Sequence, residues 1–266
     1  MRKLLLIIVA ILPLLLATPA LAWGPIAHTE IGFEIVPWVS VDQPAYIVGT
    51  VLPDVAMANA FGAWVPEQNM FHAPEYVSAL KANANIDELK SFVKGWQTHL
   101  ASDKVEESYG VGKSLAVYPA VDAILYPGRV VSITISSAIA DLMVLVWHQT
   151  YPTYSWQPTR EWVQSSQIKF NIYLNNPNYT QAQKDAALAA LPDYQTYLTL
   201  SVKNSLDAIV LRGDAKRDGL LNMGDVITIE RMILGLTPVN CEADVDGNFC
   251  VDMGDVVKLE RIILGL

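Results

Sequence analysis

Hydrophobic residues recur at helical spacing through most of the chain. Four segments carry this pattern most clearly: Ile86–Leu100, Thr134–Trp147, Thr159–Leu174 and Thr180–Val210. Few stretches alternate between apolar and polar residues, as a half-buried strand would. Breaks rich in proline, glycine and asparagine separate the helical segments. The pattern therefore predicts a mainly α-helical protein.

The N-terminal segment, residues 1–22, has the pattern of a secretory signal peptide. Arg2 and Lys3 precede an apolar stretch at residues 4–16, and an A-x-A processing site follows at residues 20–22. A membrane anchor is the alternative, but the apolar run is short for a spanning helix. We expect the segment to be removed on export, which leaves a secreted or cell-surface protein whose first residue is Trp23.

Composition narrows the class of protein. The chain has 266 residues, of which 52% are hydrophobic and 17% charged, and its net charge is −9. A content of 7 Trp, 11 Tyr and 6 Phe argues against intrinsic disorder. The acidic balance argues against electrostatic binding to duplex nucleic acid. The length allows one or two domains.

The C-terminal segment, residues 214–266, contains an internal repeat. Met223–Val226 recurs as Met253–Val256, and Ile233–Leu236 recurs as Ile263–Leu266. Each repeat opens with a loop of regularly spaced oxygen-bearing side chains, which are Asp214, Asp218, Asn222 and Asp225 in the first loop, and Asp244, Asp246, Asn248, Asp252 and Asp255 in the second. Calcium takes about six to eight oxygen ligands, and a loop of about twelve residues that ends in a carboxylate meets that need. Two acidic helix caps would explain only the last aspartate of each loop.

The two loops depart differently from an ideal calcium loop. Lys216 stands at position 3 of the first loop, where an oxygen ligand is usual, and Phe249 stands at position 6 of the second, where glycine eases the turn. We expect two calcium sites, the first weaker than the second. The two cysteines, Cys241 and Cys250, flank the second loop. Export favours a disulfide between them, and two free thiols are the alternative.

The duplicated loop-and-helix pattern resembles a dockerin, the module that attaches secreted enzymes to a cohesin domain of a scaffold or cell-surface protein. The resemblance covers residues 214–266, and we assign residues 211–266 to this small all-α domain. It implies a cohesin domain as partner. It also implies a contact surface just after each loop, at Val226, Ile227, Val256 and Val257.

Three of the four histidines stand in motifs with carboxylates. His28 follows the expected new N-terminus, Asp54 ends a Leu-Pro-Asp motif, and His72 follows a phenylalanine. His99 and Asp103 are four residues apart, which places both on one face of a helix within reach of a common ion. Imidazole and carboxylate ligands together suit zinc. Each signal alone is common in helical proteins, so the argument depends on their order along the chain.

This order resembles the zinc-dependent phospholipase C family, whose all-helical fold is shared with the fungal single-strand-specific nucleases. The resemblance is carried by residues 23–150, and we assign residues 23–210 to this domain. It implies one zinc ion held by Asp54, His72, His99 and Asp103. It implies a neighbouring ion held by the amine and carbonyl of Trp23, by His28 and by Asp103 as a bridge.

The third zinc site of the family is altered in this sequence. Where the family has a histidine a few residues after the His-x-x-x-Asp unit, this chain has Glu107. On the later helix Asp141 is present, but Ser137 stands where the family has a histidine or glutamate. The third site is therefore either rebuilt from Glu107 and Asp141, with His148 as a further candidate ligand, or absent, so we expect two or three zinc ions.

The resemblance implies hydrolysis of a phosphodiester, with Asp54 as the catalytic carboxylate that orients the attacking water. A phospholipid is favoured as substrate over single-stranded nucleic acid. A nuclease with the same metal core is the first alternative, and it would need aromatic platforms for bases, for which Trp64, Tyr109 and Trp147 are candidates. A non-catalytic, metal-stabilised module carried by a dockerin is the second.

Overall fold

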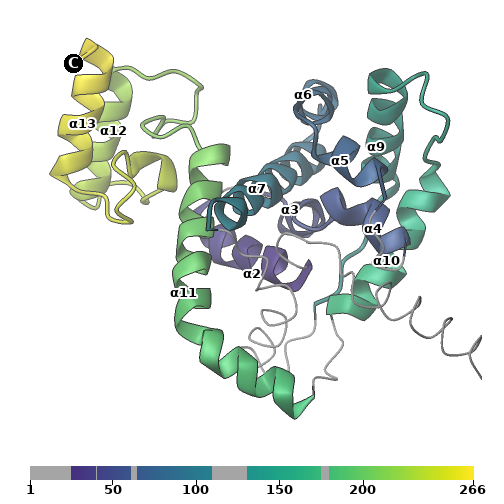
Figure 1. The fold of residues 1–266 in the computed structure, drawn as a ribbon. Helices are drawn as coiled ribbons and strands as arrows, with labels where there is room; N and C mark the ends of the chain where they lie inside the picture. The colour runs from purple at the N-terminus through teal and green to yellow at the C-terminus, as the bar shows by residue number, and fades with distance from the viewer. Residues whose placement is uncertain (1–24, 40, 61–64, 110–130, 175–179) are drawn as a thin grey trace, which may run out of the picture.

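The computed structural model describes residues 25–39, 41–60, 65–109, 131–174 and 180–266 (Figure 1). All the regular elements in these ranges are helices, and no β-strand occurs among them, which confirms the mainly α-helical prediction. No helix in the same ranges is both long and apolar enough to span a bilayer. The predicted signal peptide and Trp23 lie outside the described residues.

The N-terminal body is built from helices of very different length. Along the chain they are α2 (Pro25–Ile35), η1 (Val36–Trp38), α3 (Gln43–Gly49), η2 (Leu52–Asp54), α4 (Val55–Asn59), α5 (Glu67–His72), α6 (Pro74–Asn83), α7 (Asp87–Tyr109), α9 (Ser137–Thr150), α10 (Arg160–Leu174) and α11 (Gln181–Ile209). The C-terminal part contributes α12 (Met223–Ile233), η3 (Cys241–Ala243) and α13 (Met253–Leu264).

The four helices expected from hydrophobic spacing are present as α7, α9, α10 and α11. Helix α9 begins after Ser136, whose side chain accepts a hydrogen bond from the backbone N–H of Ile139 and so caps the first turn. Helix α7 continues to Tyr109, beyond the expected end at Leu100. This extension puts His99 and Asp103 on one continuous helix.

Helix α7 runs through the middle of the body, with α3 packed along it and α11 on another side (Figure 1). Helices α6 and α9 pack on each other at the far side from α11. The largest fully buried side chains are aromatic, and Trp96, Trp147, Tyr46, Tyr76 and Phe71 lead them. Burial of this much aromatic surface is the main stabilising contribution to the body.

Two glycines allow α3 and α7 to approach each other more closely than other residues would. A Cβ atom on Gly49 would lie 2.1 Å from the carbonyl oxygen of Phe92, and one on Gly95 would lie 2.0 Å from that of Tyr46. Both positions are therefore restricted to glycine by contact between backbones. This contact fixes α7 relative to the segment that follows α3.

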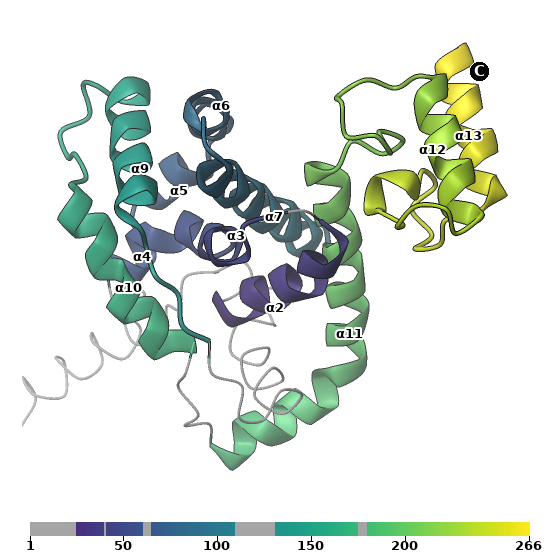
Figure 2. The same cartoon turned by 180° about the vertical axis from the view of Figure 1, so that it is seen from behind.

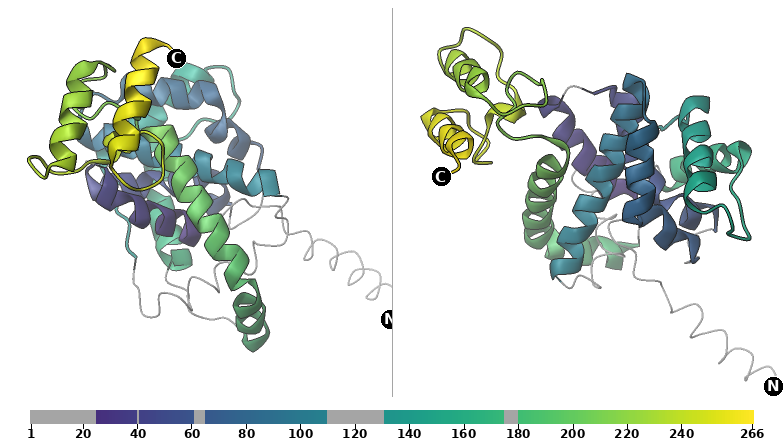
Figure 3. Two further views of the ribbon diagram at one scale, coloured as in Figure 1. Left: turned by 90° about the vertical axis from the view of Figure 1, so that its left-hand side faces the viewer. Right: turned by 90° about the horizontal axis from the view of Figure 1, so that it is seen from above.

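The C-terminal module, α12 to α13, has a small core of its own. Val226, Ile229, Val256 and Leu259 are buried in it, and they form a cluster separate from the core of the body. The views from behind and from above place α12 and α13 beyond α11, at one end of the molecule (Figures 2 and 3).

Candidate metal centre

Helix α7 supplies two residues of the candidate centre, His99 and Asp103, one turn apart on the same face. His99 Nε2 lies 3.2 Å from Asp103 Oδ2. Both residues are buried. Because α7 is held against α3 by the paired glycines, these two side chains have a fixed position relative to Asp54, which η2 supplies just after α3.

Three further helices bring the remaining predicted ligands to the same place. Asp54 Oδ1 lies 3.7 Å from His99 Nε2 and 3.8 Å from His72 Nε2. His72, at the end of α5, places Nε2 3.1 Å from His99 Nε2 and 3.5 Å from Asp103 Oδ2. His28, in α2, stacks on His99 and places Nε2 3.3 Å from Asp103 Oδ1. The structure thus brings together five residues that the sequence analysis singled out.

Hydrogen bonds orient all three imidazoles so that Nε2 faces the cluster. His99 Nδ1 donates to the carbonyl oxygen of Thr50 at 2.9 Å, and His72 Nδ1 donates to that of Gln68 at 2.8 Å. His28 Nδ1 lies 3.0 Å from Ser102 Oγ, which donates its own proton to the carbonyl oxygen of His99. Each Nε2 therefore faces the shared space, where it can hold a proton or a metal ion, the arrangement that metal-binding histidines adopt.

The charges in the cluster perturb one another strongly. Burial lowers the pKa of His72, but hydrogen bonding and attraction to Asp103, together with Asp54, outweigh it and raise the pKa to about 9. Burial and the neighbouring His28 lower the pKa of His99. Burial opposes ionisation of Asp103, yet the surrounding imidazoles hold its pKa well below the usual range. Burial raises the pKa of Asp54, and His99 and His72 offset only part of that rise.

The donor set fits a metal ion. His28, Asp54 and His99 offer ligand atoms within 4.8 Å of one another, and so do His72, His99 and Asp103. Two buried atoms, His28 Nε2 and Asp103 Oδ1, have no hydrogen-bond partner among the described residues. A buried polar atom without a partner is costly, and a cation between these atoms would satisfy both.

The other predicted zinc ligands are not in this cluster. Asp141 lies on the exposed side of α9 and makes a bidentate ion pair with Arg160 of α10, with N–O distances of 2.5 and 2.6 Å. The side chain of Glu107 and the whole of Trp23 lie outside the described residues. The structure therefore brings together the four residues predicted for the first ion, together with His28 of the second, and it gives Asp141 a different partner.

The residues that orient the ligands were not predicted. Gln68 Nε2 donates to Asp54 Oδ1 at 2.6 Å, and Ser102 Oγ and the Thr50 carbonyl hold His28 and His99. Gln68 precedes His72 by one helical turn, and Ser102 follows His99 by one turn. This spacing was the only feature of the sequence that could have indicated their contact with the histidines. A backbone carbonyl such as that of Thr50 leaves no signal in the sequence.

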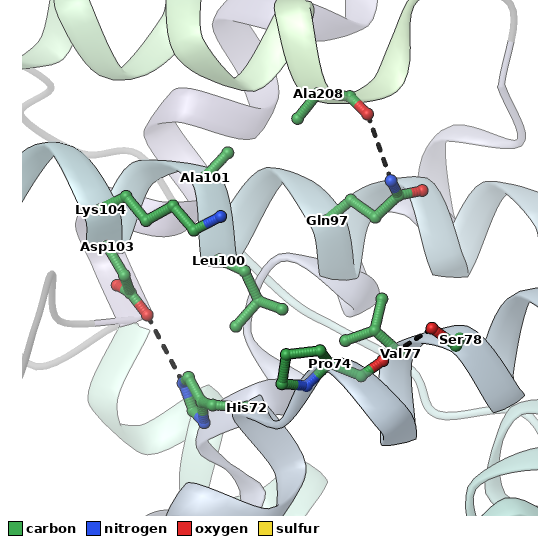
Figure 4. A pocket seen from close by; sticks show the side chains of 10 residues that line it. All are labelled: His72, Pro74, Val77, Ser78, Gln97, Leu100, Ala101, Asp103, Lys104 and Ala208. Atoms are coloured by element: carbon green, nitrogen blue, oxygen red, sulfur yellow. Dashed lines mark hydrogen bonds and ion pairs between the residues drawn. The ribbon is translucent and has the colours of Figure 1, made fainter.

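A cleft of about 400 Å³ opens beside the cluster (Figure 4). His72 and Asp103 form one side of it, where they face each other, and Lys104 lies next to them on α7. The rest of the lining is largely apolar and includes Pro74, Val77, Leu100 and Ala101. The cleft thus combines the candidate metal ligands, one cationic side chain and a surface suited to hydrocarbon.

The two acidic loops of the C-terminal module follow the same backbone path. Positions 4 and 6 have a left-handed backbone in both, at Arg217 and Gly219 in the first loop and at Gly247 and Phe249 in the second. Each loop therefore has one glycine and one strained residue at these two turns. Asp225 and Asp255 each accept backbone N–H groups from their own loop and complete a capping box at the start of α12 or α13.

Each loop gathers three carboxylates. Ligand atoms of Asp214, Asp218 and Asp225 lie within 4.8 Å of one another, as do those of Asp244, Asp246 and Asp255. Asn222 and Asp252 instead cap the following helices through Gly224 and Gly254, and the side-chain oxygen of Asn248 accepts from the backbone N–H of Cys250.

Two sequence predictions about the module need correction. Cys241 and Cys250 do not form a disulfide: both are free thiols, Cys241 buried in η3 and Cys250 exposed at position 7 of the second loop. Of the residues expected to form a contact surface, Val226 and Val256 are buried in the small core. Ile227 and Val257 are the exposed members, at equivalent positions of the two helices.

The comparisons with known proteins add no relative. No protein-family model, curated protein or solved structure matches the chain.

Proposed function

We propose that the chain is a zinc-dependent phosphodiesterase of phospholipase C type, exported and attached to a cohesin-bearing scaffold or surface through a calcium-binding dockerin. The observation that carries the enzymatic part is the convergence of three imidazole Nε2 atoms and two carboxylates, with each Nδ1 already held by a hydrogen bond. His72 Nε2 and His99 Nε2 face each other across 3.1 Å, so the two atoms can share either a proton or a metal ion.

The cleft favours a phosphodiester with an apolar part. Its charged side has room for a phosphate group beside His72 and Lys104, and its apolar wall, with Val77 and Leu100, suits acyl or glyceryl carbons. No Phe, Tyr or Trp side chain lines this cleft within the described residues, so a stacked base has no such platform there. Trp147, one of the candidate platforms, is fully buried in the core, and the side chains of Trp64 and Tyr109 lie outside the described residues. A phospholipid is therefore preferred over single-stranded nucleic acid.

In the proposed reaction the protein's own groups bind and orient. Zinc ions, when bound, would neutralise phosphate charge and make water more acidic. His28, His72, His99 and Asp103 would hold the ions, and Asp54 would both hold an ion and orient the attacking water. Gln68 fixes Oδ1 of Asp54 by its 2.6 Å hydrogen bond, which leaves the other carboxylate oxygen for that role. Lys104 balances the charge of the phosphate.

One observation favours a second candidate, a non-catalytic module stabilised by metal. Asp141, the carboxylate expected to help hold a third ion, is engaged by Arg160. A centre with fewer ions would still stabilise the fold, because the buried ligands need a cation.

The first prediction concerns metal content and turnover in correctly processed protein that begins at Trp23. The His72→Ala variant removes a ligand at the rim of the cleft, so we expect loss of zinc and at least about a hundredfold loss of phosphodiesterase activity. The measurement combines elemental analysis with assays of a chromogenic phosphodiester, phosphatidylcholine vesicles and single-stranded DNA. His148, exposed on α9, gives the matched histidine control, and His148→Ala should keep both zinc and activity.

The outcomes separate the candidates. Bound zinc with hydrolysis of phosphatidylcholine supports the phospholipase, and hydrolysis of DNA alone supports a nuclease. Bound zinc without turnover of any substrate supports the structural module. Wild-type protein without zinc would contradict all three.

A further inference from the structure

The two acidic loops differ at position 3, which is Lys216 in the first loop and Asp246 in the second. The backbone is the same at both positions. The N–H of Lys216 donates to Asp225 Oδ1 at 3.0 Å, and the N–H of Asp246 donates to Asp255 Oδ1 at 3.1 Å. Compared with the second loop, the first loop therefore has an ammonium group in place of an oxygen ligand at position 3, and its backbone follows the same path.

The ammonium group of Lys216 turns into its own loop. Lys216 Nζ donates to Asp218 Oδ2 at 2.5 Å, and Asp218 belongs to the group of three carboxylates that includes Asp214 and Asp225. The hydrogen bond to Asp218 is the main cause of a raised pKa for Lys216, and the charges of Asp225 and Asp214 also raise it. The ammonium group therefore pairs with Asp218, and the charges of Asp214 and Asp225 also favour its charged form.

We propose that the Lys216 ammonium is the resident cation of the first loop, so that this loop folds without calcium and only the second loop binds the ion. Calcium at the first loop would lose the position-3 oxygen and would compete with Lys216 for Asp218. It would also stand close to a fixed positive charge, and repulsion between like charges at such distances is strong. The part concerning the second loop rests on the proposed dockerin function.

The second loop lacks such an internal cation. Arg212 reaches it from outside and pairs with Asp244 at 3.1 Å, but within the described residues no ion pair reaches Asp246 or Asp255. Asp246 and Asp255 accept hydrogen bonds from backbone and amide N–H groups, but no cationic side chain among the described residues pairs with them. Their mutual repulsion makes this loop dependent on calcium.

Hydrogen exchange of the full chain tests the first half of the proposal. The N–H groups of Asp218 and Gly219 bond to Asp214, and those of Gly247 and Asn248 bond to Asp244. In EDTA, the amides of the first loop should remain protected, while those of the second should lose protection. In Lys216→Met, which lacks the charge but keeps much of the chain length, the first loop should also lose protection. Loss of protection in both loops of the wild-type protein would overturn the proposal.

Exchanging the residues at position 3 of the two loops tests the second half of the proposal, that only the second loop binds calcium. Equilibrium dialysis of the zinc-loaded full chain counts the bound calcium ions. Wild-type protein should bind a single calcium ion. Lys216→Asp should bind a second, and the matched change Asp246→Lys should bind none. Two ions in the wild type, or a single ion in Lys216→Asp, would contradict the role of Lys216. If the wild type binds no calcium while its first loop stays protected in EDTA, the dockerin assignment fails and the role of Lys216 stands.

Discussion

At the scale of single residues, the cluster holds a proton where the proposal places a metal ion. His72 has its pKa raised to about 9 by Asp103 and Asp54, which more than offset the effect of burial. In metal-free protein near neutral pH, His72 is therefore protonated and paired with an ionised Asp103, whose own pKa is depressed. A metal ion must displace that proton, so metal binding and protonation compete for the same Nε2.

The second prediction follows from this competition. The folded-state pKa of His72 lies above its ordinary value of 6.5, so its stabilising contribution is complete below pH 6.5 and is lost as the pH rises to about 9. Metal-free protein should therefore lose stability across this range while its zinc affinity increases. Urea unfolding at several pH values, with calorimetry in buffers of different ionisation enthalpy, measures both effects.

The control for this pH dependence is His72→Gln, which keeps a polar side chain but cannot titrate. The free energy of unfolding of its metal-free form should depend much less on pH over the same range. If the stability of the wild type and of His72→Gln changed equally with pH, the titrating proton would belong to another group in the cluster.

The sequence predicted which candidate ligands come together better than it predicted their surroundings. His28, Asp54, His72, His99 and Asp103 stand out because imidazoles and carboxylates recur in a specific order, and the structure brings them within a few ångströms of one another. The groups that orient them are ordinary polar atoms, such as the amide of Gln68 and the backbone carbonyl of Thr50. Such atoms occur in every helical protein, so only the folded chain shows which of them point to a ligand.

At the scale of elements, the geometry of the centre depends on how closely α3 and α7 approach. The carbonyl of Thr50, which holds His99, lies just after α3, and His99 itself lies on α7. Hydrophobic spacing predicted α7, but it could not predict this contact, because a glycine in a helical pattern also occurs where nothing packs against it. The distances at Gly49 and Gly95 show the reason for each glycine.

The third prediction is that Gly95→Ala destabilises the protein and weakens the metal centre together. The new methyl group would meet the Tyr46 carbonyl oxygen, so the two helices must separate, at a cost of about 3 kcal/mol. Separation also stretches the bond from His99 to Thr50, so zinc affinity should fall. Thermal unfolding and a zinc titration with a competing chelator measure the two effects.

Lys90→Ala on the exposed side of the same helix is the control, and it should change stability by no more than about 0.5 kcal/mol. An unchanged zinc affinity in a destabilised Gly95→Ala protein would separate the packing of α3 and α7 from the geometry of the centre.

At the scale of the whole molecule, the second acidic loop connects the module to the body. Phe249, at the left-handed position 6, stacks edge-on against Trp38 of η1 with ring centroids 6.2 Å apart and packs against the main core. Arg212 joins the same loop to Asp207 at the end of α11 through its ion pair with Asp244. The repeat in the sequence predicted a separate module, but it predicted no contact with the body and marked Phe249 only as an irregularity.

The fourth prediction is that Phe249→Ala releases the module from the body without unfolding either. Alanine keeps a Cβ at this left-handed position, so the backbone strain is retained and only the packing on Trp38 is lost, worth about 2 kcal/mol. X-ray scattering in calcium should show a larger radius of gyration, and calorimetry should show two transitions, one for each core. Leu220 is an exposed apolar residue of the first loop, and Leu220→Ala should change neither the radius of gyration nor the number of unfolding transitions. A compact Phe249→Ala protein with one transition would assign the docking to Arg212 instead, because its ion pairs would then suffice to hold the second loop against α11.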